Sequence, residues 1–137
     1  MEEKRIGNLY EQIAAAKLDP AVGIRIAHLT GSESFSFFGA EIAPHKRIAA
    51  HYHKSGEEIY LLIEGEGIMY TGKPDMSGKV EWNPPLILKK GDSFTISQGE
   101  VHQLFNDSDN RIIVVFGCPA SHLSTDRIIV EGFLSPC

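Results

Sequence analysis

The sequence predicts an all-β fold, an antiparallel barrel or jelly roll of about nine short strands that follows one short helix. Thirteen glycines and seven prolines are spread over the whole length and divide the chain into short apolar runs. A length of 137 residues is typical of one domain and can bury a core without disulfides. We expect an N-terminal helical arm over residues 1–20 and a barrel domain over residues 21–137.

Helical periodicity is confined to residues 8–18. Leu9, Ile13 and Ala16 share one face of the predicted helix, and Asn8 is suited to cap its start. We expect this helix to pack on the outside of the body or against a partner.

The remaining chain is divided into predicted strands and turns. Gly65-Glu66 separates two apolar runs, which predicts a hairpin of the segments on either side. Residues 73–85 contain three prolines, Pro74, Pro84 and Pro85, together with Gly78, and they are expected to form a longer loop. The predicted strands are residues 23–29, 34–42, 49–53, 58–64, 67–71, 86–88, 93–97, 102–106 and 111–116.

Charge and cysteine content exclude several classes of protein. The net charge is −5 with the six histidines neutral, and no basic run appears, which argues against nucleic acid or an anionic membrane as partner. No apolar stretch approaches the ~20 residues of a membrane helix, and the N-terminus lacks the apolar region of a signal peptide. Cys118 and Cys137 form no disulfide framework, and Cys118 is expected to be buried. A cytoplasmic protein with reduced thiols is predicted.

The segment HYHKSGEE, residues 51–58, carries the strongest chemical signal. On a strand, His51 and His53 point to the same face. We expect residues 54–56 to turn the chain, so that Glu58 returns a carboxylate from the next strand to the same point. Two nitrogens and one oxygen arranged in this way would bind a divalent transition metal and leave coordination positions open.

A second segment, residues 91–106, supplies a further candidate ligand. Gly91-Asp92 begins a strand, a turn follows at residues 97–99, and His102 begins the partner strand. We expect His102 to reach the ion from a distant strand, which requires the sheet to close on itself.

These two segments resemble the two motifs of the cupin superfamily. In the first, HxH is followed by Glu and then Gly, and in the second, Gly is followed by PxG, His and Asn. The one departure is Ser97, which stands where the family usually has proline; this loosens a turn but removes no ligand. The matching residues are His51, His53, Glu58 and Gly65 in the first motif, and Gly91, Gly99, His102 and Asn106 in the second.

The resemblance implies a double-stranded β-helix barrel of the cupin type with one divalent metal ion per chain inside its mouth, and often a homodimer. Manganese, iron, nickel and zinc are all compatible with the predicted ligands. Related cupins carry out decarboxylation, dioxygenation, isomerisation or lyase reactions, and this ligand set is similar to that of manganese oxalate decarboxylases and of iron or nickel dioxygenases. The catalytic residues are unknown, since the nearest loop carboxylates, Glu57 and Glu66, are expected to be solvated.

Strand alternation also predicts a substrate pocket. Tyr60 and Leu62 share the face of Glu58, and Leu104 shares that of His102. A mostly apolar pocket with a metal and a few polar groups is typical of a small-molecule site. Tyr60 either donates a hydrogen bond to a substrate or is a core tyrosine. The other three histidines, His28, His45 and His122, are isolated in sequence and are not expected to be ligands.

Three functions are compatible with these features. The first is a metalloenzyme that acts on a small organic acid, a diketone or diol, or a sugar, with the ion as Lewis acid. The second is a non-catalytic binding or sensor cupin, although the chain has no room for a DNA-binding domain. The third, a metal-free structural barrel, is disfavoured because all four ligand positions carry ligating residues.

Overall fold

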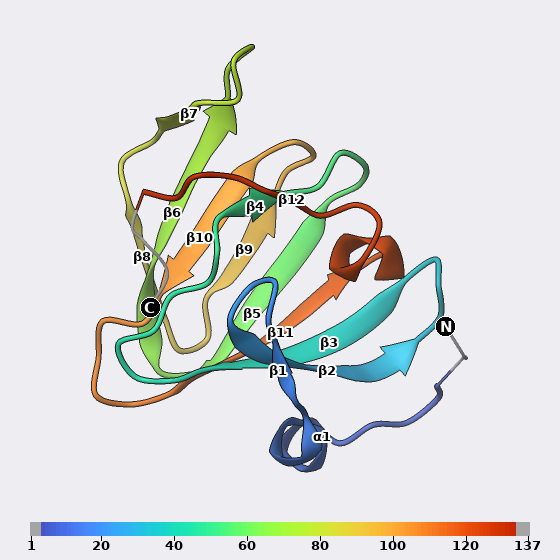
Figure 1. Ribbon diagram of the computed structural model, residues 1–137. Coiled ribbons are helices and arrows are strands. Elements are labelled where there is room, and N and C mark those ends of the chain that lie inside the picture. Colours follow the sequence, from blue (N-terminus) through green and yellow to red (C-terminus); the bar gives the residue numbers. More distant parts are fainter. Residues whose placement is uncertain (1–3, 134–137) are drawn as a thin grey trace.

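The computed structural model describes residues 4–133, and its strands form two antiparallel sheets (Figure 1). The six-stranded first sheet has the order β1 (Leu18–Asp19), β2 (Ile24–Gly31), β3 (Ser36–Ile42), β11 (Ile112–Cys118), β5 (Glu58–Glu64) and β9 (Ser93–Ile96). The second sheet has the order β12 (Ile128–Ile129), β4 (His51–Tyr52), β10 (Val101–Phe105), β6 (Glu66–Pro74) and β7 (Val80–Trp82), with β8 (Leu86–Lys89) also paired to β6. The predicted all-β fold is therefore confirmed.

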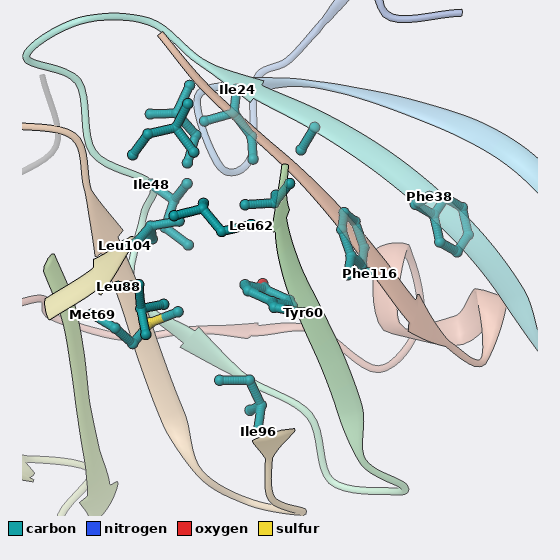
Figure 2. Packing of buried hydrophobic residues seen from close by; sticks show 14 of the residues in the cluster. Ile24, Phe38, Ile48, Tyr60, Leu62, Met69, Leu88, Ile96, Leu104 and Phe116 are labelled. Carbon is teal, nitrogen blue, oxygen red and sulfur yellow. The ribbon is translucent and has the colours of Figure 1, made fainter. Parts of the chain in front are cut away.

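The main hydrophobic core fills the space between the two sheets (Figure 2). Alternation along β5 shows why: Tyr60 and Leu62 are buried, whereas Ile59 and Leu61, which alternate with them, are exposed. The same strands therefore carry core residues on the inner face and solvent-exposed residues on the outer one. Among the most deeply buried side chains are Phe38, Ile42, Leu62, Met69, Ile96, Leu104 and Ile112.

The N-terminal helix α1 spans Leu9–Ala15 and is shorter than predicted. Asn8 caps it, since its side-chain oxygen accepts a hydrogen bond from the Glu11 N–H at 3.1 Å. Ile13 packs on Ala27 and Ile113, so the helix covers part of the first sheet from outside. Within residues 4–133, no helix combines the length and apolarity needed to cross a membrane.

The predicted hairpin across Gly65 is wrong. β5 pairs with β9 and β11, whereas β6 pairs with β7, β8 and β10, so the chain passes from one sheet to the other at this point. Gly65 has φ 83°, and a Cβ atom there would lie 2.6 Å from the Arg111 carbonyl oxygen. Glycine at position 65 therefore allows the chain to cross tightly from one sheet to the other. β6 does not pair with β5, because β9 and β11 already occupy both edges of β5.

The predicted loop over residues 73–85 is also partly wrong. β6 continues to Pro74, and β7 returns beside it, with Gly72 opposite Trp82. The turn between them is stabilised by Asp75, whose carboxylate accepts hydrogen bonds from the Ser77 and Lys79 backbone N–H groups. Pro74 and Gly78 made this β6–β7 hairpin resemble a loop in the sequence. Pro74 is nevertheless compatible with a strand, because it is the last residue of β6.

We predict that Gly65→Ala destabilises the protein more than Gly91→Ala. Both glycines have positive φ, 83° and 93°, so each substitution costs about 1–2 kcal/mol of backbone strain. Only the Gly65 substitution also meets backbone atoms, because nothing lies within 4 Å of a Cβ at Gly91. Urea unfolding measures both losses, and equal losses would contradict the close approach at the crossing.

Candidate metal centre

The four predicted ligands come from both sheets and are all buried. His51 lies on β4 and pairs directly with His102 on β10, while His53 follows β4 by one residue. Glu58 is the first residue of β5 in the opposite sheet. The predicted strand arrangement is therefore wrong in detail: His102 comes from the neighbouring strand, and Glu58 comes from the distant one.

The three imidazoles converge on a common point. Candidate ligand atoms of His51, His53 and His102 all lie within 4.8 Å of one another. The ring centroids of His51 and His102 are 4.2 Å apart, and each lies 5.2–5.4 Å from that of His53. Since metal–nitrogen bonds measure about 2.0–2.1 Å, small side-chain adjustments suffice for these nitrogens to share one ion.

Backbone carbonyls fix the orientation of each of these histidines. A carbonyl oxygen only accepts hydrogen bonds, so each Nδ1 carries the hydrogen and each Nε2 presents its lone pair. This is the arrangement by which proteins orient metal-binding imidazoles. The contacts are His51 Nδ1 to the Ala49 oxygen at 2.8 Å, His53 Nδ1 to the Asp126 oxygen at 2.6 Å, and His102 Nδ1 to the Glu100 oxygen at 3.3 Å.

Two of these nitrogens have no hydrogen-bond partner within the described part of the chain. The Nε2 atoms of His53 and His102 are buried and unsatisfied. His53 Nε2 lies 3.0 Å from Glu58 Oε2, but the contact does not meet hydrogen-bond geometry, so a lone pair faces a carboxylate oxygen. Buried acceptors that face one another are costly unless a cation lies between them. The residues present therefore fit a divalent metal ion.

The electrostatics of the site agree with this arrangement. Burial lowers the pKa of His51, and it lowers that of His102 to about 4, so both rings are neutral at physiological pH. Burial alone would raise the pKa of Glu58, but the hydrogen bond from His122 outweighs it and holds the pKa well below its usual range. Neutral imidazoles and an ionised carboxylate are the states in which these groups bind metals.

His122 belongs to the site, although no sequence motif indicated it. It lies on the short 3-10 helix η1 (Ala120–Leu123), and its ring stacks on that of His53 at 3.9 Å with 3° between the planes. Its Nδ1 lies 3.0 Å from Glu58 Oε2, and its Nε2 lies 2.5 Å from the Ser55 carbonyl oxygen. Ligand atoms of His53, Glu58 and His122 form a second group that could hold a metal.

The charge of His122 follows from its two partners. Both the carboxylate and the carbonyl only accept hydrogen bonds, so both ring nitrogens carry hydrogen. Burial lowers the pKa of His122, but the hydrogen bonds to Glu58 and Ser55 outweigh it and raise the pKa overall. The expectation that His122 is isolated is therefore wrong. His28 bonds Ser36 and His45 bonds Asp109, both away from the site.

A small cavity of about 30 Å³ lies beside these residues. One water needs about 10–15 Å³ by this measure, so the space holds only small molecules. Tyr60 and Leu104 line it as the strand pattern indicated, while Leu62 lies in the core behind it. The lining also includes Val22, Ile24, Ile26, Ala40, Ile42, Ile48, Val114, Phe116, Leu123 and Arg127.

The cysteines and loop carboxylates have ordinary positions. Cys118 is a free, buried thiol, as predicted, and burial together with the nearby Glu58 charge raises its pKa. Cys137 lies outside the described residues. Glu57 and Glu66 are exposed, which is the position expected for solvated carboxylates.

We predict that the metal-free protein loses stability as the pH falls from 7 to 4.5. In the unfolded chain His102 binds a proton near pH 6.5, whereas in the folded chain it does so only near pH 4. Between these values the unfolded state binds more protons, so the free energy of unfolding falls by on the order of 3 kcal/mol.

Urea unfolding of chelator-treated protein measures this effect. His102→Gln should show a shallower dependence on pH, whereas His45→Gln, at an exposed site, should behave like the wild type. Identical pH profiles for wild type and His102→Gln would contradict the burial of a neutral imidazole.

Comparison with known proteins agrees with the fold and the motifs. Residues 39–116 match the family model of the cupin domain, which is more than half of the chain. Auxin-binding protein T85 of Nicotiana tabacum is 30% identical over 95 residues, which cover 66% of this chain and 50% of that protein. The chain thus spans about half the length of this curated relative.

Solved structures show the same fold at lower sequence identity. A double-stranded β-helix protein from Klebsiella pneumoniae superposes with a TM-score of 0.68 and 21% identity, over 95% of this chain and all of that chain. An oxalate oxidase superposes with a TM-score of 0.61 and 19% identity, over 87% of this chain and 61% of that one. With the matched family model and the two motifs in place, the chain belongs to the cupin family.

Proposed function

We propose that this chain binds one divalent metal ion through His51, His53, Glu58 and His102, and holds a small organic molecule beside it. The observation that carries the proposal is the convergence of imidazoles whose Nδ1 atoms are fixed by carbonyls, with two buried Nε2 atoms left unsatisfied. Three nitrogens and one carboxylate oxygen suit manganese, iron, nickel or zinc.

The metal, when bound, supplies a Lewis acid that polarises a carbonyl or stabilises an enolate or carboxylate. The chain's own residues exclude water and orient the ligand, because the cavity walls are mostly aliphatic and aromatic. Burial, and then the Glu58 charge, raise the pKa of Tyr60 well above its usual value. The Tyr60 hydroxyl therefore stays protonated, and it is suited to donate a hydrogen bond to a bound ligand.

Among the ligand classes expected from the sequence, a small organic acid is favoured over a diketone, a diol or a sugar. Arg127 lines the cavity, and its guanidinium donates to Asp19 at 2.9 Å, which uses one of its five N–H groups. An arginine in a mostly apolar wall is suited to bind a carboxylate.

An enzymatic role and a binding role both have support. The metal ligands and protonated donors favour an enzyme of decarboxylase, dioxygenase or isomerase type. A non-catalytic binding cupin is favoured by a different observation: Glu58 is the one carboxylate among the described lining residues, and it is a proposed ligand, so no carboxylate remains to act as a base. A relative named as an auxin-binding protein is consistent with that second role.

The homodimer, the cytoplasmic location, the absence of a nucleic acid partner and the division into arm and barrel remain predictions. The homodimer is supported by an apolar surface on the outer side of the first sheet. Phe37 and Ile59 are exposed there on either side of Gly117, with Phe35 beside them and Leu61 next along β5. A contiguous apolar surface of this kind is typical of a protein interface.

We predict that His51→Ala and His102→Ala each lose bound metal while the barrel still folds. Each substitution removes one of four ligands, whereas His45→Ala changes an exposed histidine away from the site. Elemental analysis should find near one ion per chain in the wild type and in His45→Ala, and less than a tenth of that in the other two. Circular dichroism checks folding, and stoichiometric metal in both variants would refute the assigned ligands.

We predict that small carboxylic acids raise the melting temperature of the metal-loaded protein, because a ligand that binds only the native state stabilises it. Arg127→Gln should reduce the shift caused by an acid more than that caused by its neutral amide. Amides that bind the wild type as well as the acids do would contradict the preference for an acid. Product analysis of every stabilising ligand then separates turnover from binding alone.

A further inference from the structure

We propose that residues 119–130 form a strap that closes over the metal centre, and that His122 is the positioning residue through which the strap holds Glu58. This inference rests on the proposed metal site and adds to it a part of the chain that lies outside both cupin motifs. Figure 1 shows this C-terminal segment, in red, running from η1 past the strand β4 through β12.

The strap contacts three of the four proposed ligands. His122 Nδ1 donates to Glu58 Oε2 at 3.0 Å, and the Asp126 carbonyl accepts from His53 Nδ1 at 2.6 Å. Ile129 on β12 pairs with His51 on β4. Displacement of the strap would therefore free two ligand side chains and the strand that carries a third.

A second set of bonds clamps the strap to the backbone around His53. The Asp126 carboxylate accepts from the Lys54 N–H at 2.7 Å and from the Ser55 N–H at 2.9 Å. The Val130 N–H donates to the Ala50 oxygen at 3.0 Å. These bonds lie on both sides of His51 and His53, so opening of the strap would have to break all of them.

The geometry of His122 indicates a role in positioning and not in packing alone. Its ring is held by hydrogen bonds at both nitrogens and by the parallel ring of His53, and its side chain is fully enclosed. A carboxylate that accepts a bond from such a fixed donor loses its rotational freedom before the metal arrives. Outer partners of this kind typically change metal affinity by about 10–100-fold when they are removed.

The strap also forms part of the cavity wall. His122, Leu123 and Arg127 all line the cavity, which holds only about 30 Å³ in this closed arrangement. A ligand larger than a few water molecules therefore requires the strap to move. Because coupling between two sites is reciprocal, metal binding and strap closure stabilise each other by the same factor.

Cobalt(II) titration of the full chain, followed by visible absorption, tests the metal side of this coupling. His122→Ala should weaken cobalt binding at least 10-fold and alter the absorption spectrum, while His45→Ala should match the wild type. His122→Asn, which keeps a side-chain N–H near the position of Nδ1, should restore part of the affinity. Wild-type or tighter affinity and an unchanged spectrum in His122→Ala would overturn the positioning role.

Hydrogen exchange tests the strap side. Cobalt should slow amide exchange across residues 119–130 in the wild type, and slow it less in His122→Ala and His122→Asn. Unchanged exchange in the wild type on metal binding would overturn the coupling. If the wild type binds no metal, the proposed function fails together with this inference, whereas equal binding by wild type and His122→Ala sinks only the inference.

Discussion

The structure depends on bringing donor atoms from two different sheets to one buried point. His51 and His102 sit on paired strands, and Glu58 arrives from the sheet that faces them. An ionised carboxylate in an apolar interior is costly unless hydrogen bonds or a cation compensate it. The separation of the sheets must therefore match the reach of these side chains, and that separation is set by the core between them.

Strand alternation makes the core and the metal centre one structure. Tyr60 lies two residues beyond Glu58, and Leu104 lies two residues beyond His102, so each ligand shares an inner face with a core residue. Tyr60 packs on Phe116 with ring centroids 5.4 Å apart, and its ring lies edge-on to His102 at 6.0 Å. Packing that holds the sheets together thereby also holds the ligands in place.

The parts of this arrangement that depend on local pattern could be predicted from the sequence. Period-two alternation was sufficient to assign the strand over residues 58–64 with its observed bounds and to place Tyr60 and Leu104 on the cavity wall. The spacing of the two motifs was sufficient to select four side chains that the fold does bring together.

The parts that depend on which strands become neighbours could not be predicted in this way. A glycine turn at Gly65 suits a hairpin and a crossing between sheets equally well, because both need a residue with positive φ. The two-residue strands β1 and β12 are too short to show any periodicity. His122 and Glu58 are 64 residues apart in sequence, and no local motif predicts a contact between them.

The protonation states of the side chains in the site limit the chemistry that the site can support. Glu58 is committed to the proposed metal, Tyr60 retains its proton, and His122 donates from both ring nitrogens. The described cavity lining therefore presents the Tyr60 hydroxyl and a cationic Arg127, but no free acceptor placed to remove a proton. Such a site stabilises negative charge that is already present or that develops on a ligand. Binding of an acid, or a reaction that gathers charge on a carboxylate or enolate beside the metal, follows from this environment more directly than proton abstraction does.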